Sequence, residues 1–403
     1  MSRILLAWEL GGNLGHVGGF IPLAQELRRR GHEPILVLRD LSRVASLAQN
    51  AGLPLLQAPV WQGAGKAEQP LNYAEILLGF GFMDADGLSS MVNAWRNLIV
   101  LASPQLLIFD HAPTALLASR GLPVSRALFG TGFYSPPRTS PFPPMRRWRQ
   151  HSLQQLMESE AQVLAAANVA LARIGVTPLS RLTDLFEIDE DFLCTFRELD
   201  HYPQRDGNAR YWGTRYAYGS GRDPMWPPGA GKRVFAYLDK DYGDLAQVLQ
   251  ALAASSARVL VYSPGISPQL ALRYQSANMA FLADSVDFEK LCGKCDVGVC
   301  HAGHGTTSAL LLAGIPLLLL PGQLEQYLLA LNVQDMGAGL LVNPEEQNKD
   351  YALPLGRLLM EPGFGQSAKN FAAKYAHESQ QERVNKIVDR CEEIILQACA
   401  GKR

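Results

Sequence analysis

The sequence predicts an α/β protein with two doubly wound, Rossmann-like domains, and three observations lead to this fold class. The chain has 403 residues, more than one hydrophobic core usually supports. Short apolar segments of strand length alternate with segments whose apolar residues recur at helical spacing, which is the pattern of a parallel sheet covered by helices. This alternation occurs twice, on the two sides of an irregular stretch at residues 203–232.

The domain boundaries follow from the same pattern. Residues 203–232 contain Pro, Gly, Arg, Tyr and Trp without periodicity, as interdomain linkers do. We therefore expect an N-terminal domain at 1–202, this linker, and a C-terminal domain at 233–366. Residues 367–403 form a C-terminal tail that is largely helical.

In the first domain, apolar runs and helical patterns succeed one another. Gly31 and Gly52 directly follow two of the helical patterns, at the position where glycine most often ends a helix. Strands are expected at 3–8, 34–38, 53–57, 105–109 and 123–128, and helices at 17–30, 41–50, 73–78, 88–101, 112–120 and 152–167.

The second domain repeats this alternation. Strands are expected at 233–238, 258–262, 279–282, 296–300, 315–320 and 340–342. Helices are expected at 242–253, 288–294, 308–313 and 328–336, with a short one before residue 279. Because helices separate successive strands, both sheets should be parallel.

Composition restricts the partners and the location of the protein. A formal net charge of −1 gives no reason to expect binding to nucleic acid. The apolar run at residues 3–8 is too short for a signal peptide. The most apolar region, residues 309–320, is interrupted by Gly314 and Pro316 and is too short to span a bilayer. We therefore expect a cytoplasmic protein.

Cys292, Cys295 and Cys300, followed by two histidines, can be interpreted as a zinc site. However, Cys292 is expected on a short helix and Cys300 at the end of a buried strand. Ligands on such elements converge poorly. We therefore favour reduced, mostly buried thiols and expect no bound metal.

The most informative stretch is residues 296–326, which begins DVGVCHAGHGTT. A short buried strand leads into a turn with Gly303 and Gly305 and then into an apolar helix. The first helical N–H groups of such a turn lack partners and carry the positive end of the helix dipole, so they can hold a phosphate. Thr306 and Thr307 offer hydroxyls as well. The alternative is a tight turn that binds nothing.

With its flanks, this pattern resembles the donor-sugar signature of the UDP-glycosyltransferase family and of its relatives with the GT-B fold. The resemblance is strong in the C-terminal third of the chain and looser before it. It implies two Rossmann-like domains facing a central cleft, with a C-terminal tail that crosses back to the first domain. It also implies that His301 meets the donor diphosphate and that Glu325 and Gln326 bind sugar hydroxyls. The implied donor-binding set is His301, Gly303, His304, Gly305, Thr306, Thr307, Glu325 and Gln326.

A second Gly-rich turn, GGNLGH, follows the first strand and ends in His16. It resembles the catalytic-histidine turn of UDP-glycosyltransferases and the first Gly-rich turn of the lipid-II GlcNAc transferase. The ordinary pKa of histidine lies near working pH, so His16 can act as the base that takes the acceptor's proton. Alternatively, His16 hydrogen-bonds within the turn or contacts phosphate.

Asp110 ends the strand QLLIFD, where the family often keeps an aspartate that orients the catalytic histidine. A carboxylate at the second ring nitrogen fixes the tautomer and supports the imidazolium. Alternatively, Asp110 is the N-cap of the helix expected from residue 112. His111 beside it is a weaker candidate for the base.

The sequence departs from the family after the first strand of the second domain, where a Gly/Ser turn is common. Residues 234–240 read VFAYLDK, and Lys240 either meets donor phosphate or is solvated. No Asp-x-Asp pair stands at a strand end. We therefore expect the helix dipole and His301 to neutralise the leaving group without a divalent metal.

An irregular loop at residues 130–149, GTGFYSPPRTSPFPPMRRWR, contains five prolines, which exclude regular structure over most of it. Its arginines stand close to aromatic residues. It is either a solvated basic edge or a rim for an acidic or lipid-linked acceptor. The second interpretation includes a peripheral membrane contact through residues 133–149.

These observations predict an inverting, metal-independent glycosyltransferase with His16 and Asp110 as catalytic residues. It would move a hexosyl or deoxyhexosyl group from a UDP- or TDP-linked donor to a hydroxyl of a small-molecule or lipid-linked acceptor, without a cofactor. One alternative is a sugar-nucleotide epimerase of the same architecture, which needs several acid/base carboxylates. Another is a non-catalytic sugar-nucleotide-binding protein without a functioning base.

Overall fold

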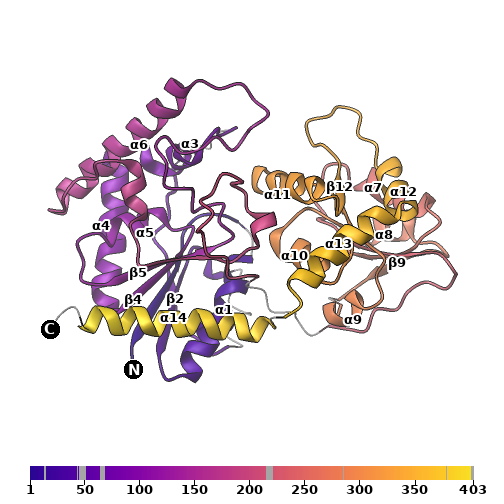
Figure 1. Ribbon diagram of the computed structural model, residues 1–403, viewed down its shortest axis with the longest axis horizontal. Coiled ribbons are helices and arrows are strands. Elements are labelled where there is room, and N and C mark those ends of the chain that lie inside the picture. Colours follow the sequence, from indigo (N-terminus) through magenta and orange to yellow (C-terminus); the bar gives the residue numbers. More distant parts are fainter. Residues whose placement is uncertain are drawn as a thin grey trace. The chain divides into compact units, whose positions relative to one another are not determined.

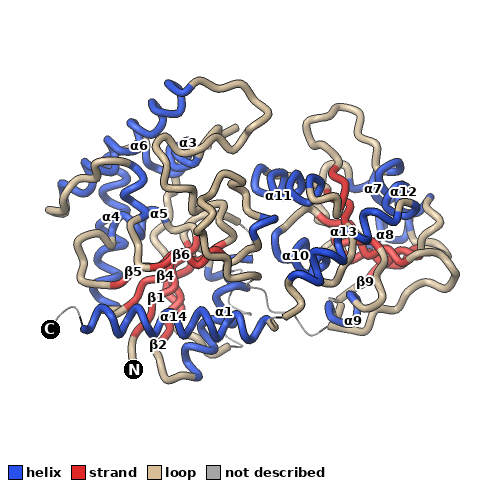
Figure 2. Tube along the Cα trace, in the orientation of Figure 1, coloured by secondary structure: helices blue, strands red, loops and turns tan. Residues whose placement is uncertain are grey.

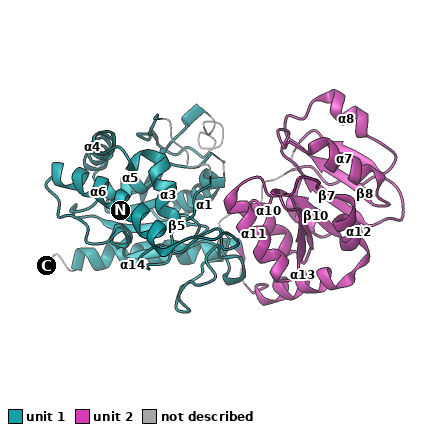
Figure 3. Ribbon diagram, turned by 90° about the horizontal axis from the view of Figure 1, so that it is seen from above, with its two compact units in different colours: residues 1–216, 380–403 teal, residues 217–379 magenta. Residues whose placement is uncertain are grey.

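The computed structural model (Figure 1) describes residues 1–12, 15–42, 44, 51–63, 69–214, 221–284, 286–377 and 379–400. Strands and helices alternate through most of this length (Figure 2). The chain divides into two compact units, Met1–Tyr216 with Gln380–Arg403, and Ala217–Ser379 (Figure 3). The helix expected at 41–50 lies largely outside the described residues, as do parts of the GGNLGH turn and of the expected linker.

In the described part of the first unit, six parallel strands form one sheet. Its order is β3-β2-β1-β4-β5-β6. The strands are β1 (Arg3–Trp8), β2 (Glu33–Leu38), β3 (Leu55–Gln57), β4 (Leu106–Asp110), β5 (Ser125–Gly130) and β6 (Glu190–Leu193). The sequence analysis did not identify β6, whose sequence EDFL begins with two half-buried acidic residues and offers no apolar run.

The helices of the first unit fall into two groups. They are α1 (Gly15–Arg29), α3 (Tyr73–Leu77), α4 (Ala85–Ala102), α5 (Pro113–Ala118), α6 (Leu153–Arg173) and α14 (Gln380–Ala400), with a π-helical turn at Leu78–Phe82. Helix α4 packs on α5 and α6, whereas α14 lies along α1 (Figure 1). In the described residues, no helix is long and apolar enough to cross a membrane.

Helix α14, the last part of the chain, belongs to the first unit. Val384 and Ile387 join the core that α1 also lines. Arg30, directly after α1, donates hydrogen bonds to Asp389 (2.5 Å) and Glu392 (3.1 Å) of α14. Apolar burial and paired charges together therefore fix the C-terminal helix on this unit.

The stretch expected to be a linker is divided between the units. Residues 203–214 belong to the first unit. There Trp212 is buried in the core, with its ring edge-on to Phe192 at 4.9 Å between centroids. Single buried aromatic residues leave no periodic signal, so this packing was not visible in the sequence.

The second unit has the same winding. Its described strands are β7 (Arg233–Tyr237), β8 (Arg258–Tyr262), β9 (Met279–Leu282), β10 (Val297–Cys300), β11 (Leu317–Leu319) and β12 (Gly339–Leu341), all parallel, in the order β12-β11-β10-β7-β8-β9. Counted from its own first strand, each sheet has the order 3-2-1-4-5-6 of a doubly wound fold. The predicted fold class of two Rossmann-like domains is confirmed.

The helices of the second unit are α7 (Leu245–Ala254), α8 (Pro268–Tyr274), α9 (Phe288–Cys292), α10 (His304–Leu312), α11 (Leu324–Asp335), α12 (Ala352–Met360) and α13 (Pro362–Lys374). Two of them begin four residues earlier than their apolar periodicity indicates, α10 at His304 and α11 at Leu324. Polar residues expected in loops therefore occupy first helical turns. Helix α12, with an internal proline and glycine, was not expected.

In each sheet, the direction in which the strands are added along the chain reverses between two neighbouring strands. In the first unit β1 pairs with β4, with Trp8 opposite Asp110. In the second, β7 pairs with β10, with Tyr237 opposite Cys300. Ligands of doubly wound sheets bind outside the carboxyl ends of the strands at this switch point. Both Gly-rich turns follow one of these strands.

Candidate active site

In the first unit, His16 lies in the first turn of α1. Its Nδ1 is 2.9 Å from Oδ2 of Asp110, although the approach lies outside the usual angular range of a hydrogen bond. Both side chains are buried, and the imidazole stacks on Trp8 with ring centroids 5.3 Å apart. A carboxylate at Nδ1 favours the tautomer with its proton there and leaves Nε2 as the basic atom.

The basic atom of His16 lies against the Gly-rich turn. A Cβ on Gly11 would stand 2.7 Å from Nε2, and the φ of Gly11 is +92°, a conformation that other residues rarely adopt. A Cβ on the neighbouring Gly12 would meet nothing within 4 Å. The turn therefore requires glycine at position 11 to leave room for the imidazole.

Glu9, which no motif indicated, provides the carboxylate that caps the helix after β4. Its Oε2 accepts hydrogen bonds from the N–H groups of Thr114 (3.0 Å) and Ala115 (3.3 Å). The N-cap residue of α5 is Ala112, so the alternative role of Asp110 as its N-cap is wrong. Burial raises the pKa of Glu9 to about 7, although both hydrogen bonds oppose this shift.

His111 and Tyr134 lie next to His16. The His111 and Tyr134 rings stack with their centroids 3.3 Å apart. The Tyr134 ring centroid is 6.0 Å from that of His16. Burial lowers the pKa of His111 well below its ordinary value, which makes it a poor proton acceptor. Of the histidines after β1 and β4, the one that contacts a carboxylate is His16.

The phosphate-binding turn predicted in the second unit is the open N-terminus of α10. Its N-cap is Gly303, which has no side chain to accept from the helix, and the first intrahelical bond of the turn runs from Thr307 N–H to Gly303 O at 3.0 Å. The N–H groups of residues 304–306 precede that bond. A Cβ on Gly303, the residue before these N–H groups, would meet nothing within 4 Å, so the space beside the helix start is open at this position.

The side chains of this turn differ in whether a ligand can reach them. The Thr307 side chain is fully buried, with its hydroxyl 3.8 Å from Sγ of Cys300. His304 is also buried, 3.4 Å from the Ser308 hydroxyl. Thr306 is half-buried. The expectation that both threonine hydroxyls face a ligand is therefore wrong for Thr307, because the earlier start of α10 turns it toward β10.

His301 connects three strand ends. The N–H of Asp239, after β7, donates to its Nε2 at 2.8 Å, and Nδ1 is 2.8 Å from the carbonyl oxygen of Leu320, after β11. Nε2 must accept, so Nδ1 carries the proton. Burial also lowers the pKa of His301. The ring is thus held neutral, and the expectation that it neutralises a leaving diphosphate by charge is not supported by this geometry.

The expected sugar-binding pair lies in the first turn of α11. Glu325 and Gln326 are both half-buried, and Oε1 of Gln326 accepts a hydrogen bond from Gly322 N–H at 2.8 Å. Because the Oε1 atom of Gln326 is used in this hydrogen bond, the orientation of the amide is fixed. The NH₂ group of the same amide is then the part that can donate to a hydroxyl. Lys240 is exposed, and its Nζ is 2.6 Å from a carboxylate oxygen of Asp241.

The cysteines do not gather around a metal position. All six are free thiols, and burial raises the pKa of both Cys292 and Cys295 to about 12. Within the described ranges, no three His, Cys, Asp or Glu side chains are grouped so as to hold a metal ion.

The loop after β5 is mostly packed rather than exposed. Phe133, Phe142 and Met145 are each less than 5% exposed. Arg138 pairs with Asp191 at 3.1 Å. Two parts of the loop are open to solvent, residues 138–140 and residues 147–148, where the Trp148 side chain is 37% exposed. The aromatic side chains Phe133 and Phe142 are thus packed inside, whereas Arg138 and Arg147 are exposed, as the interpretation as a solvated basic edge expects.

Residues 248–394 match the erythromycin biosynthesis protein CIII-like, C-terminal domain family. A PGL/p-HBAD biosynthesis glycosyltransferase of Mycobacterium tuberculosis is 24% identical over 319 residues, covering 75% of this chain and 74% of that protein. The chain is a glycosyltransferase of the GT-B type. The resemblance stated from its motifs is confirmed.

Solved structures of glycosyltransferases share the fold of this glycosyltransferase over nearly its full length. VinC in complex with DTDP aligns with a TM-score of 0.69 and 18% identity, over 97% of this chain and 100% of that one. The spinosyn rhamnosyltransferase SpnG aligns with a TM-score of 0.69 and 17% identity, over 96% of this chain and 100% of that one.

Replacing Gly11 should impair glycosyl transfer far more than replacing Gly12. In Gly11→Ala the new Cβ displaces the His16 imidazole and strains the backbone, so we expect turnover to fall at least about 10-fold. Gly12→Ala, its matched control, should retain turnover because its Cβ meets open space. Steady-state transfer rates with circular dichroism of both variants provide the measurement. Equal rates in the two variants would contradict the packing described for Nε2.

Glu9 should make stability decrease as pH rises through neutrality. Its folded pKa of about 7 lies above the ordinary 4.5, so the folded state binds more protons between these values. The free energy of unfolding should therefore fall by up to about 3 kcal/mol as pH rises from 4.5 to 7. Glu9→Gln should remove this component, since an amide oxygen can still accept from α5. Urea unfolding of both proteins at a series of pH values tests this, and parallel curves would refute it.

Proposed function

We propose that this glycosyltransferase moves a hexosyl or deoxyhexosyl group from a TDP- or UDP-linked donor to a hydroxyl group, with inversion and without a metal ion. The observation that carries the proposal is the pair of switch-point sites. One holds the His16–Asp110 contact and the other the open N-terminus of α10. The first supplies a base and the second an anion site, the two requirements of transfer from a nucleotide sugar.

The donor diphosphate is bound by the backbone of α10. The N–H groups of residues 304–306 and the positive end of the helix dipole meet the phosphate oxygens, and the Thr306 hydroxyl adds a donor. His301 acts as a neutral support that keeps the chain after β7 beside this turn. VinC has been solved in complex with DTDP and SpnG in complex with thymidine diphosphate, which favours TDP over UDP as the nucleotide.

The acceptor is activated by His16. Nε2 takes the proton of the acceptor hydroxyl as its oxygen bonds to the anomeric carbon and the bond from that carbon to the diphosphate breaks. Asp110 stabilises the imidazolium that forms. The oxygen attacks the face opposite the leaving group, so the anomeric configuration inverts. The negative charge on the diphosphate is met by helix N–H groups rather than by a cation.

The acceptor is a small molecule or a lipid-linked one. SpnG has been solved in complex with spinosyn aglycone. In this chain, Trp148 is 37% exposed beside two arginines, and Leu153 and Met157 of α6 are 63% and 55% exposed. We assign these exposed side chains a peripheral contact with an anionic lipid surface, because arginine and tryptophan suit the headgroup region.

The donor turn is tested by closing the space in front of Gly303. Thymidine diphosphate should bind tighter than thymidine, and Gly303→Val should reduce its affinity about 10-fold or more while leaving thymidine unaffected, since the side chain occupies phosphate space. Gly363→Val, in an equally open position on α13, is the matched control. Calorimetric titration of the three proteins with both ligands measures all six affinities. Equal binding of nucleotide and nucleoside by the unmodified protein would contradict the phosphate role.

The base is tested by His16→Ala, which should reduce turnover at saturating substrates by about 10²–10⁴-fold. Donor affinity should stay unchanged, because the second unit binds the diphosphate. His32→Ala is the matched control, since it breaks another histidine–carboxylate pair of the first unit, His32–Glu392 at 3.0 Å. Mass spectrometry of the products separates transfer from epimerisation. Undiminished turnover in His16→Ala would exclude it as the base.

The lipid contact is tested by sedimentation with vesicles of phosphatidylglycerol or phosphatidylcholine. The unmodified protein should bind the anionic vesicles more tightly, and the double variant Trp148→Ala, Leu153→Ser should lose most of this binding, because burial of both side chains drives it. Leu396→Ser, at a 68% exposed position on α14, is the control. Identical binding of all three proteins would refute the contact.

A further inference from the structure

The loop after β5 brings an aromatic wall to the base. Tyr134 stacks on His111 and stands 6.0 Å from His16, ring centroid to ring centroid. It is half-buried, whereas the residues on either side of it, Phe133 and Ser135, are buried. A group that approaches His16 from the side of this loop therefore meets the Tyr134 ring.

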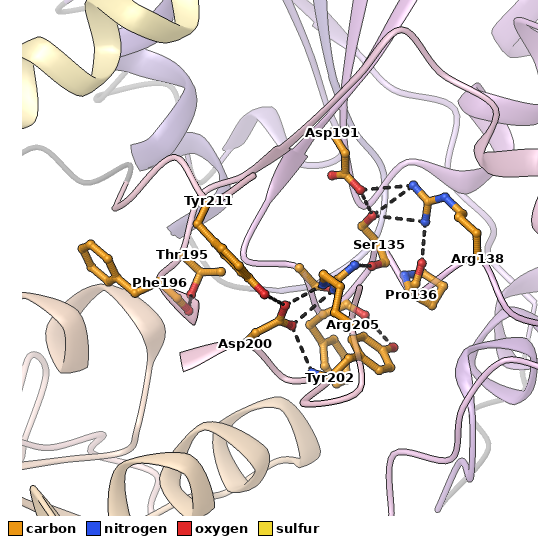
Figure 4. Close-up of polar contacts among 12 residues, drawn as sticks. Ser135, Pro136, Arg138, Asp191, Thr195, Phe196, Asp200, Tyr202, Arg205 and Tyr211 are labelled. Atoms are coloured by element: carbon orange, nitrogen blue, oxygen red, sulfur yellow. Dashed lines mark hydrogen bonds and ion pairs between the residues drawn. The ribbon is translucent and has the colours of Figure 1, made fainter. Parts of the chain in front are cut away.

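The backbone around Tyr134 is held by two side chains from residues 202–205. Arg205 donates from Nη1 to the carbonyl oxygen of Ser135 (2.9 Å) and from Nη2 to that of Gly132 (3.2 Å). The Tyr202 hydroxyl donates to the carbonyl oxygen of Phe133 at 3.0 Å (Figure 4). Carbonyl groups before and after the tyrosine are thus fixed from the same direction.

Asp200 in turn fixes the Arg205 side chain and the backbone of Tyr202. Its Oδ2 is 2.5 Å from Nε of Arg205 and accepts from the Tyr211 hydroxyl at 2.9 Å, while Oδ1 accepts from Tyr202 N–H at 3.0 Å (Figure 4). The Arg205 and Asp200 side chains are only 7% and 2% exposed. A buried ion pair adds little net stability compared with apolar packing, but its many hydrogen bonds specify one arrangement of the chain.

A second anchor holds the far side of the same loop. Asp191, on β6, accepts from the Ser135 hydroxyl at 2.5 Å and pairs with Arg138 at 3.1 Å (Figure 4). The Arg138 guanidinium lies 4.7 Å above the Phe186 ring. The short segment that carries Tyr134 is therefore fixed on both sides, although it has no regular secondary structure.

We propose that Arg205, Asp200 and Tyr202 form a positioning network that holds Tyr134 as one wall of the acceptor site beside His16. This inference rests on the proposed function. A fixed wall keeps water from the base and orients a bulky acceptor, and a transferase needs both because water is the competing acceptor. Loosening the network therefore favours hydrolysis of the donor over transfer.

The sharpest variant is Tyr202→Phe, which removes only the hydroxyl that reaches the loop. With TDP-rhamnose as donor and 4-methylumbelliferone as acceptor probe, we expect KM for the acceptor to rise about 10-fold and hydrolysis to increase relative to transfer. Arg205→Lys should act in the same direction and more strongly. Calorimetric affinity for thymidine diphosphate should not change. Arg390→Lys, which alters another ion pair of the first unit (Arg390–Glu190, 2.7 Å), should leave all these quantities unchanged.

A double-mutant cycle tells positioning from general destabilisation. If the network acts through Tyr134, then Tyr202→Phe should add nothing to the effect of Tyr134→Ala on acceptor KM. Additive effects, or equal effects of Tyr202→Phe and Arg390→Lys, would overturn the inference.

A readout without substrate separates this inference from the proposed function. Diethyl pyrocarbonate should modify His16 faster in Tyr202→Phe than in the unmodified protein, as peptide mass spectrometry can measure. Unchanged modification in Tyr202→Phe overturns the positioning role even if transfer is observed. If the unmodified protein neither transfers nor hydrolyses sugar from TDP- or UDP-linked donors, the proposed function fails, and the assignment to an acceptor site fails with it.

Discussion

The chemistry of this chain depends on one topological constraint, the reversal of strand order in each sheet. Where β1 meets β4 and β7 meets β10, two neighbouring parallel strands end side by side and are followed by separate loops. The backbone N–H and C=O groups of these loops have few hydrogen-bond partners within the strand that precedes them. Side chains from different segments therefore complete the site. In the first unit His16 contacts Asp110 across this point, and in the second His301 contacts the N–H of Asp239.

The two histidines follow different strands of the switch-point pairs, β1 and β10, and have opposite electrostatic surroundings. His16 faces a carboxylate, which in the proposed mechanism stabilises the imidazolium that forms when the acceptor's proton is taken. His301 lies between a backbone N–H and a backbone carbonyl, which together fix one neutral tautomer. The same residue type is therefore suited to act as a base in one unit and as a rigid support in the other. The difference arises from the partner atoms and not from the histidine motif.

The sequence predicted what depends on local periodicity and missed what depends on contacts between distant segments. The alternation of strands and helices, and with it the fold class, follows from apolar patterns that every βα unit repeats. The capping role of Glu9 was not predictable, because its partners lie 105 and 106 residues away and meet it only once β1 pairs with β4. The orientation of Thr307 was missed for a different reason. Polar residues in the first turn of α10 carry no periodic signal, and a helix that starts four residues earlier turns this hydroxyl into the core.

The unusual chain after β7 changes how a diphosphate can be held. A Gly/Ser turn would leave its N–H groups free for phosphate, but here the Asp239 N–H is bonded to His301, and the Lys240 ammonium is paired with Asp241. In the proposed donor site, binding then falls to the N–H groups of α10, whose first turn carries no lysine or arginine. At physiological salt the Debye length is about 8 Å, so attraction between phosphate and exposed cations farther away than this is largely screened. Salt does not screen short hydrogen bonds from fixed N–H groups to phosphate oxygens in the same way. Donor affinity in this chain should accordingly vary little with ionic strength, because the site relies on oriented dipoles in direct contact with the phosphate oxygens.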